Sequence, residues 1–178
     1  MDSLRRVAAE LSIPERTLRR AAAVGLVRSK RVSERRVEVT LREEAYLRTH
    51  WELLGGLRGA LRTERNVRLA VLFGSTAAGN DGDASDIDIL VSARDPDVRR
   101  LADLSERLSG ALARDVQLVR VSEAVHSPAL MTDILEHGRV LVDREDAWPR
   151  LQRAAPRWRR EARRTERSSV PSLEDPIG

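Results

Sequence analysis

The chain of 178 residues, with 41% hydrophobic and 34% charged residues and a net charge of +4, has a globular composition and room for one compact domain plus a small module. It has no cysteine, which excludes disulfides, thiolate metal sites and a cysteine nucleophile, so any metal ion is expected to be bound by carboxylates. No apolar run approaches the roughly 20 residues that span a bilayer, and no signal-peptide stretch is recognisable, so we expect a cytoplasmic protein without membrane contact.

Two short helices and a ribbon are predicted in the first 40 residues. Apolar residues recur at helical spacing from Leu4 to Leu11, and Ser12 with Glu15 forms a capping-box pattern that opens a second helix. Gly25 is expected to end this helix in the left-handed conformation. The following segment, "LVRSKRVSERRVEVT", has the pattern of a two-stranded ribbon.

A longer helix follows, and a second capping box, Thr40 with Glu43, marks its beginning. Its apolar positions recur every three or four residues: Leu47, Trp51, Leu54, Leu57 and Leu61. This helix is expected to link the basic N-terminal module to the rest of the chain. Trp51, like Trp148 and Trp158, is expected to be a packing anchor.

The remaining segments alternate between strand and helix patterns. The predicted strands are Val67–Phe73, "SDIDILVS", Val116–Val121 and "RVLVD". The predicted helices are Asp97–Leu112, with Val98 on its apolar face, Ser127–His137, ended by Gly138, and an Arg-rich helix over residues 145–167 interrupted at Pro156. The final residues, "SSVPSLEDPIG", are expected to be disordered.

One segment, "FGSTAAGNDGDASDIDILV", carries the pattern of a chemical site. Gly74 leaves room for a phosphate to approach the backbone, and Ser75 adds a hydroxyl beside exposed amides. Asp86 and Asp88 are two residues apart on a strand, so both side chains point to one face. Mg²⁺ would remove the repulsion between these carboxylates and also bind substrate phosphates. The pattern predicts a metal–nucleotide site, while the alternative is a plain loop followed by a solvated strand start.

This segment resembles the GS-x10-D-x-D signature of minimal nucleotidyltransferases in the DNA polymerase beta superfamily, over about residues 65–145. The resemblance implies an α/β (α+β) fold with a small mixed sheet flanked by helices. It also implies two Mg²⁺ ions and transfer of a nucleoside monophosphate from a nucleoside triphosphate to an acceptor hydroxyl. Gly74 and Ser75 would then bind the triphosphate, and Asp86 and Asp88 would bind the metal.

Two departures from the family pattern bear on activity. The family's third acidic residue lies within a later strand, where this chain has Gln117. Asp115, two residues earlier on the same strand face, is the candidate replacement; the alternative is that it caps the strand start. The family also often has arginines just after the GS pair, where this chain has "TAA" at positions 76–78. Both an active enzyme and a nucleotide sensor therefore fit the sequence.

The first 40 residues resemble a winged helix-turn-helix, with Glu15–Ala23 as recognition helix and Arg28–Arg36 as wing. Residues 1–65 hold 15 Lys and Arg against 9 Asp and Glu, whereas residues 66–144 hold 9 against 13. This asymmetry suits a DNA-binding module joined to a carboxylate metal site, although a packing module with solvated arginines is the alternative. The candidate DNA contacts are Arg16, Arg19, Arg20, Lys30 and Arg31.

These patterns divide the chain into a winged helix-turn-helix-like module (1–40), a connecting helix (41–64), a nucleotidyltransferase domain (65–145) and an Arg-rich C-terminal helix with a tail (146–178). One functional hypothesis is a nucleotidyltransferase that is DNA-associated or toxin-antitoxin-like. The other is a DNA-binding transcription regulator whose domain senses nucleotides. The expected partners are a nucleoside triphosphate, DNA, a protein partner or acceptor, and a second copy of the chain. The three histidines, His50, His126 and His137, are expected to be ordinary surface or capping residues.

Overall fold

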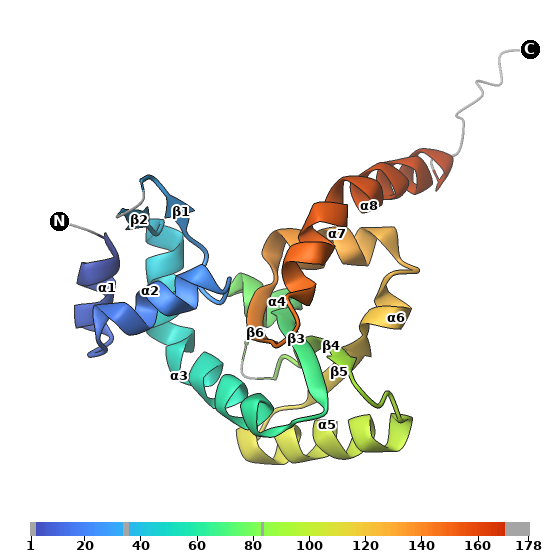
Figure 1. The fold of residues 1–178 in the computed structure, drawn as a ribbon, viewed down its shortest axis with the longest axis horizontal. Helices are drawn as coiled ribbons and strands as arrows, with labels where there is room; N and C mark the ends of the chain where they lie inside the picture. Colours follow the sequence, from blue (N-terminus) through green and yellow to red (C-terminus); the bar gives the residue numbers. More distant parts are fainter. Residues whose placement is uncertain (1–2, 34–35, 83, 170–178) are drawn as a thin grey trace, which may run out of the picture.

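A four-stranded mixed sheet, in the order β5-β4-β3-β6, lies at the centre of the structure, a computed structural model that describes residues 3–33, 36–82 and 84–169 (Figure 1). Its strands are β3 (Val67–Phe73), β4 (Ile87–Ala93), β5 (Val116–Arg120) and β6 (Arg139–Asp143). β3 pairs antiparallel with β4 and with β6, whereas β4 and β5 are parallel and are connected through α5 (Val98–Leu112). The mixed α/β fold predicted from the sequence is confirmed.

Helices cover both faces of this sheet because the inner strand β3 is apolar on both sides. Ala70 and Leu72 belong to a core cluster that includes residues of α3 (Leu41–Thr63) and α5. Leu69 and Val71 belong to a second cluster with α6 (Val121–Ala124), α7 (Pro128–His137) and α8 (Ala147–Ser169). The predicted motif from Gly74 to Asp88 therefore begins at the end of a strand whose position is determined by packing on two sides.

The N-terminal module contains the predicted order of elements: α1 (Ser3–Glu10), α2 (Glu15–Ala23) and a ribbon of β1 (Lys30–Arg31) with β2 (Val37–Glu38). Gly25 is left-handed, with φ +84°, as predicted. The predicted Ser12 cap is wrong, because Ser12 is itself left-handed and Pro14 is the N-cap residue, without a side-chain hydrogen bond. The Gly25 carbonyl accepts a 3.1 Å hydrogen bond from the amide of Val140, which joins this module to the edge strand β6.

Helix α3 begins as expected, but its Glu43 has a different role from the one predicted. The Thr40 hydroxyl accepts a hydrogen bond from the Glu43 amide at 3.2 Å. The Glu43 carboxylate does not complete a capping box; it binds both terminal nitrogens of Arg139, at 2.5 and 2.9 Å, and accepts from the Arg28 amide. Arg139 and Glu43 are only 1% and 4% exposed. Their partnership spans 96 residues, so local pattern could not reveal it.

The C-terminal helix also differs from the prediction. Helix α8 continues through Pro156 without interruption. Trp148 and Trp158, on either side of the proline, are buried in the second core cluster, and this packing offsets the lost backbone hydrogen bond. Ser168 and Ser169 lie within α8, and the rest of the segment predicted to be disordered lies outside the described residues.

Two smaller differences from the sequence prediction concern Val98 and two short helices. Val98 is 64% exposed, because it occupies the first turn of α5 above the buried stripe. The short helices α4 (Gly74–Ala78) and α6 were not predicted. Trp51, which is half-buried, packs against the core as expected. None of the helices in the described part of the chain combines the length and apolar character that crossing a membrane requires.

We expect Glu43→Ala to lower the free energy of unfolding by about 3–5 kcal/mol, because it leaves the Arg139 guanidinium buried without its counter-charge. Urea unfolding followed by circular dichroism measures this loss. The control is Glu10→Ala, which removes an ion pair between two side chains that are 36% (Glu10) and 48% (Arg48) exposed. This change should lower the free energy of unfolding by less than about 1 kcal/mol. Equal losses in the two variants would contradict the importance of the buried pair.

Candidate active site

The glycine-serine bend and the second aspartate of the motif meet at the end of β3. Phe73, the last residue of β3, pairs with Asp88 on β4. Gly74 follows with φ +72°, and a Cβ atom built on it would lie 2.5 Å from Oδ2 of Asp88. Only glycine fits here, since any side chain would be strained by the backbone and would overlap the carboxylate. Ser75 is exposed beside it, in the first turn of α4.

The two aspartates provide a concentrated negative charge next to this bend. Asp86 is exposed just before β4, and Asp88 is half-buried within it. Burial, and then the charge of Asp86, raise the pKa of the Asp88 carboxyl above its usual range. Within residues 3–33, 36–82 and 84–169, no group of three or more His, Cys, Asp or Glu side chains has the arrangement needed to hold a metal ion. The site thus contains a pair of carboxylates.

Gln117 occupies the position beside this pair. It lies next to Asp88 in the parallel register of β4 and β5, and its Nε2 atom donates a 2.7 Å hydrogen bond to Oδ2 of Asp86. Asp115 is exposed at the start of β5, and its carbonyl accepts a hydrogen bond from the Ile87 amide at 2.8 Å. Asp115 and Asp86 both line a shallow cavity of about 360 Å³. A role for Asp115 as third carboxylate stays a prediction.

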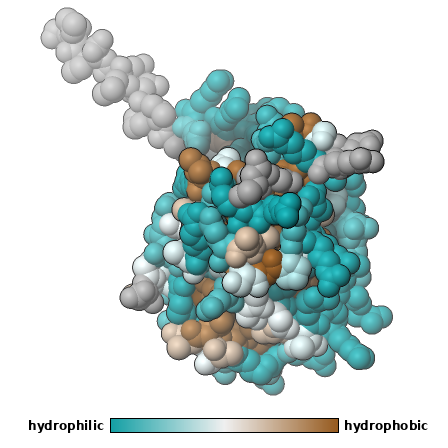
Figure 2. Space-filling model, turned by 90° about the vertical axis from the view of Figure 1, so that its left-hand side faces the viewer, coloured by the Kyte–Doolittle hydropathy of each residue, from teal (hydrophilic) through white to brown (hydrophobic). Residues whose placement is uncertain are grey.

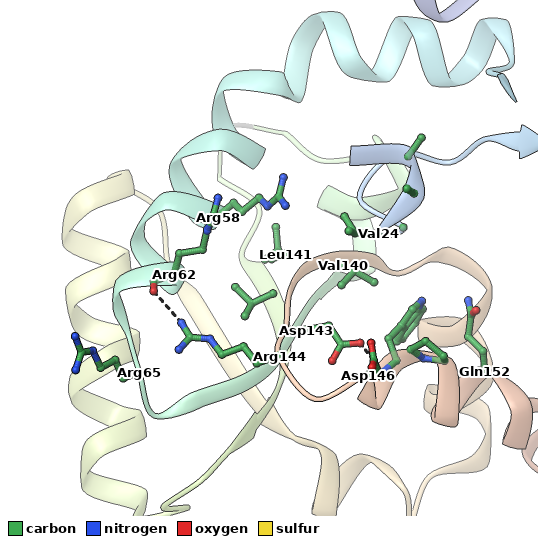
Figure 3. A pocket seen from close by; sticks show the side chains of 16 residues that line it. Val24, Arg58, Arg62, Arg65, Val140, Leu141, Asp143, Arg144, Asp146 and Gln152 are labelled. Carbon is green, nitrogen blue, oxygen red and sulfur yellow. Dashed lines mark hydrogen bonds between the residues drawn. The ribbon is translucent and has the colours of Figure 1, made fainter. Parts of the chain in front are cut away.

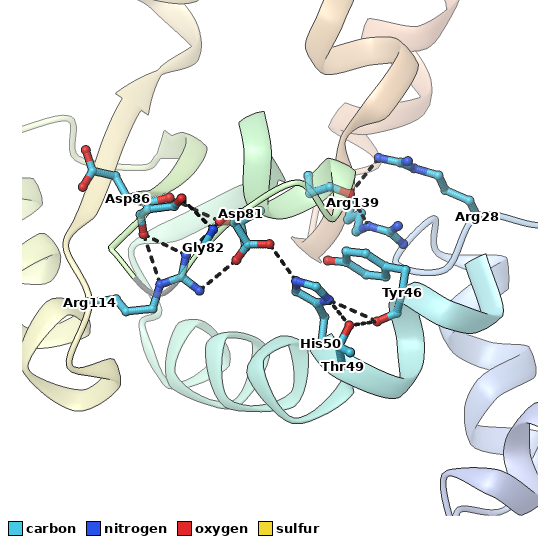
Figure 4. Close-up of polar contacts among 12 residues, drawn as sticks. Arg28, Tyr46, Thr49, His50, Asp81, Gly82, Asp86, Arg114 and Arg139 are labelled. Atoms are coloured by element: carbon cyan, nitrogen blue, oxygen red, sulfur yellow. Dashed lines mark hydrogen bonds and ion pairs between the residues drawn. The ribbon is translucent and has the colours of Figure 1, made fainter. Parts of the chain in front are cut away.

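Arg114 organises the loop that presents Asp86, and the sequence patterns did not single it out (Figure 4). Its guanidinium donates to the Ser85 carbonyl at 2.7 Å and to the Thr76 hydroxyl at 3.1 Å, and it forms a 3.0 Å ion pair with Asp81. The fully buried Thr76 hydroxyl in turn donates to the carbonyl of Asp86 at 3.2 Å. Arg114 is 38 residues from Thr76 in the sequence, and it connects α4 to the loop that presents Asp86.

His50 is not the ordinary surface residue that was expected. Its Nε2 atom lies 2.8 Å from Oδ1 of Asp81, and its ring stacks on Tyr46 with centroids 4.2 Å apart. Burial alone would raise the pKa of Asp81, but hydrogen bonds and charge from His50, with a hydrogen bond from Arg114, outweigh it and lower the pKa. Asp81 thus connects helix α3 to the loop that carries Asp86. His126 and His137 are exposed, as expected.

The candidate DNA contacts lie on the N-terminal module, on elements other than those of the carboxylate site. Arg16 and Arg20 are exposed on α2, while Arg19 is half-buried and forms a 2.6 Å ion pair with Glu15. Lys30 and Arg31 are both exposed on β1.

We expect Gly74→Ala to destabilise the protein by about 1–3 kcal/mol, because alanine is strained at a positive φ and its methyl group would displace Asp88. Thermal unfolding monitors the change. Gly59→Ala is the matched control, since a Cβ atom there meets nothing within 4 Å in helix α3 and should stabilise by up to about 1 kcal/mol. Tolerance of alanine at position 74 would argue against the close approach.

Asp88→Asn should make the metal-free protein more stable than the natural chain at pH 7. The raised pKa means that the folded chain holds this proton more tightly than the unfolded chain, so the charged carboxylate destabilises the fold. That destabilisation is complete above the folded pKa and absent below the unfolded value of about 3.9. Melting temperatures in a chelating buffer should therefore differ at pH 7 and converge toward pH 4. A less stable variant at pH 7 would contradict this electrostatic account.

Comparison with known proteins identifies a domain that includes this motif. The model of the polymerase beta nucleotidyltransferase domain matches residues 57–147, just over half of the chain. A chain from the crystal structure of a toxin-antitoxin with AMP-PNP is 24% identical, with a TM-score of 0.56, over 68% of this chain and 98% of its own length. No curated protein matches the chain.

Two further solved structures have the same fold. One contains the tri-AMPylated Shewanella oneidensis HEPN toxin in complex with MNT antitoxin, at 22% identity and a TM-score of 0.54, over 71% of this chain and 100% of that one. The toxin-antitoxin MntA-HepT matches at 22% identity and a TM-score of 0.52, over 70% and 99%. These similarities show a shared fold. The domain match over residues 57–147 identifies the chain as a member of the polymerase beta nucleotidyltransferase family.

Proposed function

We propose that this chain transfers a nucleoside monophosphate from a magnesium-bound nucleoside triphosphate to an acceptor hydroxyl. The acceptor oxygen forms a bond to the α-phosphorus, the bond from the α-phosphorus to the bridging oxygen of the β-phosphate breaks, and pyrophosphate leaves while the hydroxyl proton passes to water. Gly74 and Ser75 bind the triphosphate, and Asp86 and Asp88 hold the metal. Asp115 is the candidate for a third carboxylate that takes part in catalysis.

The observation that supports this proposal most directly is the contact between the Gly74 backbone and the Asp88 carboxylate. It places the backbone of the glycine-serine turn, at the beginning of α4, directly beside a carboxylate that can bind a metal ion. The donor set suits Mg²⁺, which prefers one or two carboxylates completed by phosphate oxygens and water. When bound, the ions would neutralise charge on the attacking and leaving oxygens. The raised pKa of Asp88 indicates a carboxylate whose charge is not compensated by the surrounding protein.

For the acceptor, we propose a hydroxyl on a partner protein, in a toxin-antitoxin-like setting. Two observations on the structural neighbours favour this choice: one is a toxin-antitoxin with AMP-PNP, and another contains a tri-AMPylated toxin bound to its antitoxin. ATP is correspondingly the first triphosphate to test. The similarity covers 98% and 100% of these neighbouring chains.

A second candidate function is a DNA-binding regulator whose nucleotidyltransferase domain senses nucleotides. The hydrogen bond from Gln117 to Asp86 favours it, because an amide stands beside the carboxylate pair where the family pattern has an acid. An amide is a poorer metal ligand and does not lower the cost of deprotonating an acceptor. This function would retain nucleotide binding without transfer.

A labelling experiment separates the two functions. It measures transfer of label from α-³²P-ATP, and from labelled CTP, GTP and UTP, to acceptors in a lysate with Mg²⁺. For the enzyme, Asp86→Ala with Asp88→Ala should reduce transfer by at least about 100-fold, because the charge that stabilises the reacting phosphate is lost. The matched control replaces two exposed aspartates outside the site, Asp103 and Asp133, with alanine and should leave transfer unchanged. Nucleotide binding by the natural chain without any transfer would support the sensor instead.

Gln117→Asp provides a complementary test of the same site. A carboxylate at this register position would supply the third acid beside Asp88, so we expect tighter Mg²⁺ binding than in the natural chain. Isothermal titration calorimetry with Mg²⁺ and a nonhydrolysable ATP analogue measures the change. Gln152→Asp, an exposed position on α8, controls for the added charge. Equal Mg²⁺ affinities in the two variants would show that position 117 does not face the metal.

We further propose that the N-terminal module binds duplex DNA through α2 and the ribbon. In the view from the side of the N-terminal module, the surface is largely hydrophilic (Figure 2). Binding should weaken steeply with salt, and Arg16→Gln with Arg20→Gln should lower the slope of log K against log salt by about 2, one unit per lost phosphate contact. Arg160→Gln with Arg163→Gln, exposed on α8, is the charge-matched control. Fluorescence anisotropy shows the difference, and identical slopes would remove the assignment to α2.

A further inference from the structure

A cavity of about 420 Å³ opens where the N-terminal module, helix α3 and the catalytic domain meet. Its volume lies within the range of sites for small ligands. The lining residues that matter here come from all three parts: Arg28, Lys30, Arg42, Tyr46, Ala78 and Arg139. None of the residues assigned to the triphosphate or the metal lines it.

The cavity has an excess of positive charge. Arg139 is neutralised by Glu43, and the other acidic lining residue, Glu38, forms an ion pair with Arg36. Lys30 and Arg42 have no hydrogen-bond or ion-pair partner for their side chains among the described residues. Two cationic side chains are therefore available to a ligand on this wall.

Arg28 adds a third positive charge without a paired carboxylate. Its Nη2 atom donates to the carbonyls of Ala77 and His137, and its buried Nε atom has no hydrogen-bond partner in the structure. Burial, and then the nearby charge of Arg139, lower the pKa of the Arg28 guanidinium. An anion in the cavity would relieve this unfavourable charge.

The shape and chemistry of the lining limit the kind of anion. Tyr46 is its one aromatic side chain, and both faces of that ring are occupied, by His50 at 4.2 Å and by the Arg139 guanidinium at 3.4 Å. No aromatic face is left for a nucleobase to stack on. Arg139 and Tyr46, 1% and 5% exposed, form a recessed wall that a free phosphate group can reach more readily than the backbone of a duplex. A compact phosphorylated molecule fits best.

We propose that this cavity binds a small phosphorylated ligand through Lys30, Arg42 and Arg28, at a site separate from the triphosphate site. Lys30, assigned to DNA from the sequence, would then contact this ligand.

Occupancy of this site is expected to influence the catalytic turn. Arg28 and Arg139 both donate to the carbonyl of Ala77, at 3.0 and 2.9 Å, and Ala77 belongs to the five-residue helix that begins at Gly74 (Figure 4). A ligand that reorders Arg28 would therefore act on the helix that carries the proposed phosphate-binding turn. By linkage, a bound triphosphate would change the affinity of the cavity by the same factor.

The test is calorimetric titration of the full chain with inorganic phosphate at constant ionic strength, in a metal-free buffer. Phosphate affinity should fall at least tenfold in Lys30→Gln with Arg42→Gln, which loses two charge-assisted contacts. Both side chains are exposed, so the fold should be retained. The matched control, Arg160→Gln with Arg163→Gln, makes the same change of charge at exposed positions on α8, outside the cavity and the proposed DNA contacts, and should stay within about twofold of the natural chain.

Three outcomes would overturn the proposal. Phosphate binding that survives in Lys30→Gln with Arg42→Gln would place the anion elsewhere, the triphosphate site included. An equal loss in the control pair would indicate a general effect of charge. A natural chain that ignores phosphate, but whose affinity for duplex DNA falls more in the cavity variant than in the control, would make this surface a nucleic-acid contact. Failure of nucleotide transfer would leave the phosphate result intact, so the two proposals fail separately.

Discussion

The buried ion pair of Arg139 with Glu43 connects the three parts of this molecule. Arg139 begins the edge strand β6, Glu43 lies in the first turns of α3, and the same guanidinium donates to the carbonyls of Leu26 and Ala77. Two charges this deeply buried are tolerated only when their hydrogen bonds are satisfied, and here both oxygens of the carboxylate and all three guanidinium nitrogens have partners. The relative placement of module, helix and domain therefore depends on this contact.

The site depends on a second constraint at the same end of the sheet. Leu72 of β3 pairs with Arg139, and the next residue, Phe73, pairs with Asp88. The residues that pair with the ion pair and with the metal-binding candidate Asp88 are thus adjacent along β3, and helix α4 begins directly after them at Gly74. This arrangement allows packing at the N-terminal junction to influence the geometry of the active site.

A larger cavity, with a volume of about 840 Å³, lies alongside β6, between α3, α8 and the end of α2 (Figure 3). Arg58 and Arg62 line it from α3, and Arg144 donates to the carbonyl of Arg62 at 2.8 Å, which satisfies an acceptor near the C-terminus of that helix. This cavity contains none of the residues of the nucleotidyltransferase motif. Of this cavity and the shallow cavity lined by Asp86 and Asp115, the more voluminous is therefore not the one nearest the proposed site.

The sequence by itself determined the order of the strands and of the longer helices, the left-handed Gly25 and the spacing of the motif from Gly74 to Asp88, because these follow from local periodicity and from backbone conformation at short range. Only the tertiary structure decided that Gln117 donates to Asp86, that Arg114 holds the aspartate loop and that Glu43 pairs with Arg139. Each of these contacts joins residues 29 to 96 positions apart, and strand register and burial, which local patterns do not encode, select the partner.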